Sequence, residues 1–149
     1  MKFKPLLVHL LISLFSFILI SMIESFDQFM IKDYARVITY AITTIVIVGL
    51  YLLLSSKILK EMPREVILGS ITILLLINII LGISGYLLTN LGSGIVAENG
   101  QISILVFLFL NCGFYPLAAI SPLPELFNIL IISFISPLLL FLGSRKTIY

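Results

Sequence analysis

Cysteine and histidine are almost absent from this 149-residue sequence, which contains one of each, Cys112 and His9. One cysteine cannot form an internal disulfide, and it provides neither a CxxC redox pair nor a cysteine-rich metal site. A metal ion at His9 would have no second histidine and would depend on Cys112 and on distant carboxylates. The sequence therefore predicts no metal site and no bound cofactor.

Charged residues are also scarce, at 11% of the chain, whereas they make up about a quarter of a typical soluble domain. Hydrophobic residues account for 60%, and the mean hydropathy is +1.24. The net charge of +2 is small and scattered, which argues against a nucleic-acid partner. These values exclude an ordinary water-soluble domain and predict a protein whose main partner is the lipid bilayer.

Motifs for catalysis and for ion-coupled transport are missing as well. The chain contains no HExxH, no GxSxG and no pair of carboxylates inside an apolar segment. Cys112 as a nucleophile would need a base, and His9 is the only candidate. No apolar segment carries an acidic residue away from its ends, which lowers the expectation of a proton- or sodium-coupled transporter. We therefore expect a protein that is not an enzyme.

Long apolar runs are what the sequence does contain. Spanning a bilayer takes roughly 20 helical residues, and the runs are far longer than the ~10 residues of a membrane barrel strand. The first run lacks a small-x-small cleavage site, so we interpret it as a retained span. The expected fold is an all-α, polytopic helical bundle forming one transmembrane domain over residues 1–149. Its five hydrophobic segments are residues 5–23, 34–56, 66–88, 102–120 and 126–143.

The orientation follows from basic residues in short loops, which stay on the cytoplasmic side. Basic residues occur before the first segment and between the second and third, whereas residues 89–101 contain none. The N-terminus is therefore predicted to be cytoplasmic, and the residue usage is typical of a bacterial inner (cell) membrane. The residues that indicate this are Lys2, Lys4, Lys57, Lys60 and Arg64.

The last two segments allow two arrangements. Five spans would place Arg145 and Lys146 outside, leaving five of the nine Lys and Arg residues on the cytoplasmic side. Four crossings plus a re-entrant or interfacial segment within 102–143 would place seven of the nine there. Hydropathy favours five spans, because both segments are long enough and uncharged, and we expect five. The charge rule favours the alternative, and the side on which Tyr149 lies distinguishes the two.

Small and polar residues follow one face of the third segment. Asn78, Gly82, Gly85 and Thr89 recur at spacings of four, three and four, which places them along one side of a helix. Such residues let another helix approach closely, and the amide can bond across the contact. We expect a helix-packing surface, and the alternative is that Asn78 lines a pathway.

The fourth and fifth segments carry helix-breaking residues. Pro116 removes a backbone donor and clashes with the carbonyl of Cys112, so a kink is predicted there, close to Asn111. Pro137 repeats the pattern in the last segment. If the two segments form a hairpin about residues 122–124, the kinks could face each other and open a small cavity. Broken helices can bind ions or substrates, but proline is also a common packing irregularity in membranes.

Three functions remain after these exclusions. The first is a non-catalytic accessory, regulatory or immunity-type partner of another membrane protein. The second is a small transporter or channel that works as a homo-oligomer, with Asn78, Asn111 and Pro116 along its path. The third, least supported, is a membrane enzyme that acts on lipid. The helix faces suited to packing favour the first.

Overall fold

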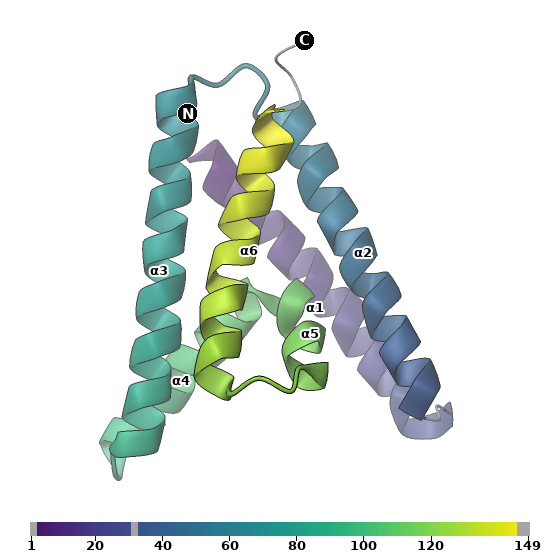
Figure 1. Ribbon diagram of the computed structural model, residues 1–149, viewed down its shortest axis with the longest axis vertical. Helices are drawn as coiled ribbons and strands as arrows, with labels where there is room; N and C mark the ends of the chain where they lie inside the picture. The colour runs from purple at the N-terminus through teal and green to yellow at the C-terminus, as the bar shows by residue number, and fades with distance from the viewer. Residues whose placement is uncertain (1–2, 31–32, 146–149) are drawn as a thin grey trace.

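A computed structural model describes residues 3–30 and 33–145, and every secondary-structure element in these ranges is helical (Figure 1). Four of these helices contain stretches long and apolar enough to cross a membrane, namely Lys4–Ser25, Arg36–Ile58, Arg64–Leu91 and Glu125–Arg145. The predicted all-helical bundle is confirmed. The elements are α1 (Lys4–Met30), α2 (Asp33–Ile58), α3 (Arg64–Leu91), α4 (Ile95–Leu110), the 3₁₀ turn η1 (Cys112–Phe114), α5 (Tyr115–Ile120) and α6 (Glu125–Arg145).

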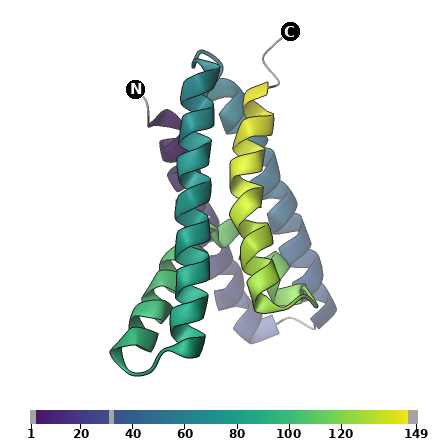
Figure 2. The same ribbon diagram turned by 60° about the vertical axis from the view of Figure 1, so that its left-hand side comes forward.

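The four long helices run the length of the bundle in alternating directions, with α1 and α3 running one way and α2 and α6 running back (Figures 1 and 2). Gly143, near the end of α6, packs against Leu52 and Ser55, near the end of α2. The start of α1, the connection between α2 and α3, and the end of α6 therefore share one end of the bundle.

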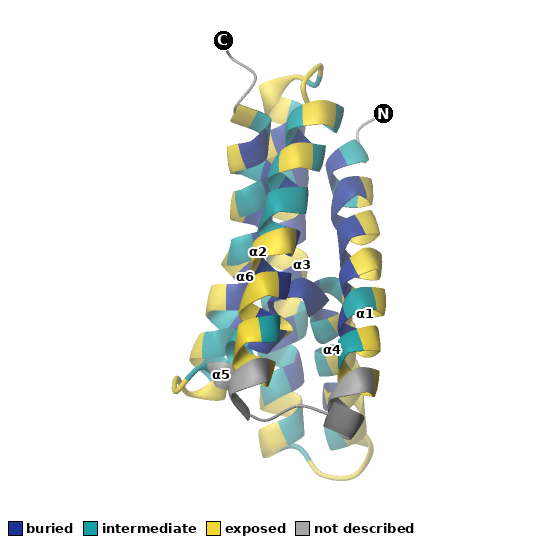
Figure 3. Ribbon diagram, turned by 90° about the vertical axis from the view of Figure 1, so that its right-hand side faces the viewer, coloured by how far each residue is buried: buried dark blue, intermediate teal, exposed yellow. Residues whose placement is uncertain are grey.

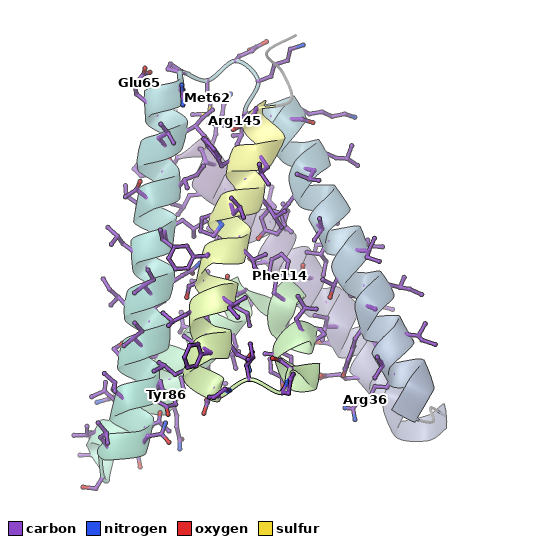
Figure 4. The ribbon with its side chains drawn as sticks, in the orientation of Figure 1. Arg36, Met62, Glu65, Tyr86, Phe114 and Arg145 are labelled. Carbon is purple, nitrogen blue, oxygen red and sulfur yellow. The ribbon has the colours of Figure 1, made fainter. Side chains whose placement is uncertain are left out.

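Charge differs between the two ends. We call one the basic end and the other the acidic end, after their described side chains. In Figure 4, Glu65, Met62 and Arg145 lie at the basic end and Arg36 at the acidic end. Lys2 and Lys146, and the side chains of Asp27, Lys32 and Asp33, are outside the described part of the chain. The basic end carries Lys4, Lys57, Lys60, Glu61, Arg64, Glu65 and Arg145, and the acidic end carries Glu24, Arg36, Glu98 and Glu125.

The fourth hydrophobic segment is not the straight helix expected over residues 102–120. The chain breaks after Leu110, and the part that follows is bent by 82° from α4. Near its start α4 packs against Thr89 at the acidic end, and its last turn leads to Asn111, which pairs with Asn78 halfway along α3. From there α5 returns to the acidic end (Figure 1). We call residues 95–120 the central hairpin, and its geometry is that of the re-entrant alternative.

The sequence predicted that Pro116 kinks a continuous helix, and this prediction is wrong. Pro116 lies in the first turn of α5, where a missing N–H has no helical partner to lose. The break comes earlier, where the N–H of Asn111 still donates to the carbonyl of Phe107 and the N–H of Phe114 donates to the carbonyl of Asn111. Proline therefore starts a new helix after the break.

The connection between α5 and α6 is the tight turn expected around residues 122–124. The hydroxyl of Ser121 accepts a hydrogen bond from the N–H of Leu123 at 3.2 Å. The side-chain amide of Asn128 donates to the carbonyl of Leu123 at 3.0 Å, which joins the turn to the first turn of α6. The hairpin and α6 are thereby held together at the acidic end.

Large apolar side chains cover the outside of the bundle, and polar ones gather in its centre. Figure 3 shows buried residues along the inward faces of the helices and exposed residues along their outer faces. Monomeric water-soluble proteins rarely expose a continuous apolar surface of this kind. The arrangement indicates transmembrane character. Exposed examples include Leu7, Leu11, Ile18, Ile38, Ile42, Ile45, Leu53, Ile80, Leu105 and Phe134.

Candidate functional site

Six polar side chains meet in the interior of the bundle, and we call them the polar centre. Each is at most 2% exposed, and they come from α1, α2, α3, α6 and the break that follows α4. Phe114 of η1 lies beside them at mid-height in the interior (Figure 4). The members of the polar centre are His9, Ser13, Tyr51, Asn78, Asn111 and Ser136.

Asn111 is the most connected residue of the polar centre. Its amide and that of Asn78 bond reciprocally, at 3.3 Å from Asn78 Nδ2 to Asn111 Oδ1 and at 3.2 Å in the other direction. Asn111 Nδ2 also donates to the carbonyl of Phe107 at 3.1 Å, and Asn111 Oδ1 accepts from the hydroxyl of Ser136 at 2.9 Å. One side chain therefore joins α3, α4 and α6 at the helix break.

A second part of the polar centre links α1 to α2. His9 Nδ1 lies 2.7 Å from the hydroxyl of Tyr51, which the hydroxyls of Ser13 and Ser136 also approach. Ser13 donates at 2.5 Å to the carbonyl of Leu110, which is the last residue of α4. A carbonyl at a helix end has no partner inside its own helix, so Ser13 caps the broken end from a neighbouring helix.

One ring nitrogen of the polar centre, His9 Nε2, is buried without a hydrogen-bond partner. His9 lies only five residues into α1, close to the basic end. The remainder of the polar centre is mutually satisfied and closed to solvent. In this conformation it holds five segments of the chain together.

The small residues of α3 are covered by other helices of the same chain. A Cβ added at Gly82 would meet Ile129 of α6 at 2.5 Å and Phe107 of α4 at 3.3 Å. A Cβ at Gly85 would lie 2.7 Å from the side chain of Ile104 and 2.9 Å from its backbone nitrogen. The face that begins at Asn78 is therefore an internal contact, in which α3 packs against α4 and α6.

The other candidate residues lie around the break but do not form one group. Cys112 is 8% exposed and lines a cavity that Glu24 also lines. Pro137 is buried inside α6, directly after Ser136, and α6 continues through it. Pro116 is buried at the start of α5. Asn78 and Asn111 are thus the two candidates that the structure places in direct contact.

Sequence reasoning did not connect His9, Tyr51 and the serines to the asparagines. A signal was present, because His9, Ser13 and Ser16 follow one another at spacings of four and three in an otherwise apolar helix. That pattern places three polar groups on one buried face. What it does not give is the partner, since Tyr51 lies 42 residues away.

Two cavities flank the central hairpin, each with a volume of about 290 Å³. The hairpin cavity lies between α4, α5 and α6, and the second lies between α1 and the hairpin. A cavity was expected between facing kinks at Pro116 and Pro137, but neither proline lines the one found there. The described residues around the hairpin cavity are Ile104, Phe107, Leu108, Tyr115, Ala118, Ser121, Leu123, Glu125, Asn128, Ile129 and Ile132.

Within the described residues, no group of three or more His, Cys, Asp or Glu side chains is arranged to hold a metal ion. No protein-family model matches this chain, and no curated protein or solved structure is significantly similar to it. A proposal for its function therefore depends on its own residues.

Proposed function

We propose that this chain is a multi-pass protein of a cell membrane, of the bacterial inner-membrane type, with its basic end in the cytoplasm. Support comes from the distribution of charge, because basic residues in short loops are retained on the cytoplasmic side. The re-entrant path of the central hairpin brings Arg145 to the same end as Lys4 and Lys57. In this arrangement residues 102–120 can be fully apolar without placing Arg145 on the side opposite to the other basic residues.

Reporter fusions test this orientation. A reporter that is active only in the cytoplasm is expected to be active at Tyr149 and in the loop between α2 and α3, and inactive when inserted after Ser93. A reporter active only outside the cytoplasm should give the opposite pattern. An inactive cytoplasmic reporter at Tyr149, with an active one between α2 and α3, would contradict the re-entrant arrangement. If all three positions reverse, the orientation is wrong and the fold is unaffected.

Within that membrane, we propose a non-catalytic role as an accessory, regulatory or immunity-type partner of another membrane protein. The observation that carries this proposal is the closed polar centre, in which Asn78, Asn111 and Ser136 are 0–2% exposed and bonded to one another. Asn78 and Asn111, the candidates for a pathway, join the helices instead. A bundle with an apolar outer surface can act through contacts made in the plane of the membrane.

Purification in a mild detergent tests this role. The expected result is one stoichiometric membrane-protein partner that co-purifies from native membranes, and no flux when the chain alone is reconstituted in liposomes. Substitutions at exposed apolar positions of one helix, such as Ile42 and Ile45 of α2, should show which face is in contact. A homo-oligomer that conducts or exchanges solute by itself would contradict an accessory role.

A small oligomeric transporter or channel is the second candidate, and the central hairpin favours it. Non-helical backbone at membrane depth is tolerated where protein buries it or where it borders a water-filled cavity, and transporters place broken helices at their substrate sites. The break at Asn111 lies at such a depth, with a cavity on each side of the hairpin. Flux in liposomes that is lost in an Asn111→Leu variant would favour this candidate.

A further inference from the structure

The hairpin cavity combines an apolar floor with a polar rim. Phe107, Ile129 and Ile132 form the floor, and each is at most 6% exposed. The rim, at the acidic end, is formed by Ser121, Leu123, Glu125 and Asn128 around the connection between α5 and α6. Phe107 also joins the floor to the polar centre, because its carbonyl accepts from Asn111.

Glu125 is the only charged side chain among the described residues that line this cavity. It lies in the first turn of α6 and is exposed, so its carboxylate is accessible from the acidic end. The surrounding charge has the same sign, since Glu24 and Glu98 share this end with a single described basic side chain, Arg36. Several carboxylates on one face concentrate cations near that face.

Two aromatic rings line the same space. Phe107 contributes to the floor and Tyr115 lies at the start of α5. The face of an aromatic ring attracts an organic cation, and quaternary ammonium groups are commonly bound in this way. The cavity therefore offers a carboxylate, two aromatic rings and an apolar floor, which together match a cation that carries alkyl groups.

Other ligand classes match less well. A hydrated metal ion needs several oxygen ligands, whereas the cavity has one carboxylate and an apolar floor. An anion would be repelled by Glu125. A neutral apolar molecule would gain nothing from the carboxylate. The volume of about 290 Å³ lies at the lower limit for small-molecule sites, which are roughly 300–1,000 Å³, so the ligand must be small.

We propose that the hairpin cavity binds a small organic ammonium ion, with its charge beside Glu125 and its alkyl groups over Phe107 and Ile132. The site is separate from the polar centre and does not depend on whether the protein is an accessory subunit or a transporter. Binding at this position would brace α5 against α6 and stabilise the hairpin in its re-entrant position.

The test compares choline with 3,3-dimethyl-1-butanol, its uncharged isostere, on the purified full chain in a non-ionic detergent. Binding is measured by isothermal titration calorimetry and by ligand-detected NMR. Choline is expected to bind saturably, and the uncharged isostere at least about tenfold more weakly. Equal affinity for the two probes, or no saturable binding of choline, would overturn the proposal.

Matched variants locate the site. Glu125→Gln removes the charge in the cavity, and Glu98→Gln removes the same charge from the same end without touching the cavity. Glu24→Gln tests the second cavity. We expect E125Q to weaken choline binding about tenfold and both controls to change it less than twofold. An equal loss of choline affinity in E125Q and E98Q would overturn the assignment to this cavity. A loss of choline affinity in E24Q alone would also overturn it.

A substitution that fills the hairpin cavity tests the proposal independently of charge. Ala118 lines the hairpin cavity, and Ala118→Phe places a ring in the space proposed for the ligand. The expected result is loss of choline binding with an unchanged circular-dichroism spectrum. Retained binding in a folded A118F variant would contradict the proposal, and if that variant does not fold, the comparison of E125Q with E98Q decides. None of these outcomes bears on co-purification with a partner, so the two proposals fail separately.

Discussion

Replacing Asn111 with leucine is expected to lower the free energy of unfolding by about 2 kcal/mol. The substitution removes four side-chain hydrogen bonds and leaves Asn78 and the hydroxyl of Ser136 without their partner in the interior. Single interhelical hydrogen bonds in membrane proteins contribute roughly 0.6 kcal/mol on average, so the loss of several together accounts for this value. Reversible unfolding in mixed micelles with increasing dodecyl sulfate measures it.

The double variant Asn78→Leu with Asn111→Leu separates hydrogen bonding from packing. Because both amides are replaced, no unpaired amide remains, and Ser136 can donate to a carbonyl in its own helix. The double variant is therefore expected to recover at least half of the stability lost in Asn111→Leu. A loss equal to the sum of the two single variants would mean that the amides do not act as a pair.

Gly100→Val is the second substitution with a large expected effect, a loss of about 3 kcal/mol. A Cβ at Gly100 would lie 2.5 Å from the backbone nitrogen of Thr89 and 2.8 Å from the carbonyl carbon of Leu88. These are backbone atoms of α3, which cannot turn aside as a side chain can. The start of α4 would have to move away from α3, and the same unfolding titration would detect the loss.

Gly49 provides the matched control in the middle of α2. No atom lies within 4 Å of a Cβ added there, so Gly49→Ala should leave stability unchanged or raise it by up to about 1 kcal/mol, since alanine favours the helix. If Gly49→Ala and Gly100→Val were equally destabilising, the effect would belong to glycine in these helices generally and not to the contact between α3 and α4.

Much of the bundle could be predicted from the sequence, because the length and hydropathy of each helix are properties of that segment alone. The segment predicted at residues 66–88 is α3, Arg64–Leu91, and the segment at 126–143 is α6, Glu125–Arg145. The path of residues 102–120 could not be settled in this way, because a straight helix and a broken one have the same hydropathy. What distinguishes them is pairing over distance, such as that of Asn111 with Asn78, 33 residues apart.

Part of the candidate site could also be predicted from the sequence, and part could not. Asn78, Gly82 and Gly85 stood out because a period of three and four residues is visible in a single helix. Their partners did not stand out, since Ile129 and Ile104 are ordinary apolar residues in sequence. The basic residues Arg145 and Lys146 are a local signal for the re-entrant path, whereas the apolar length of residues 102–120 and 126–143 favours two straight spans.

The capping of the helix break constrains the order in which the chain can assemble. The carbonyl of Leu110 is satisfied by Ser13 of the first helix, and Asn111 is completed by Ser136, which lies 25 residues further along the chain. When residues 95–120 leave the ribosome, the first of these partners already exists and the second has not been synthesised. The hairpin can reach its final hydrogen-bonded state only after α6 has been made, so α6 closes this part of the structure.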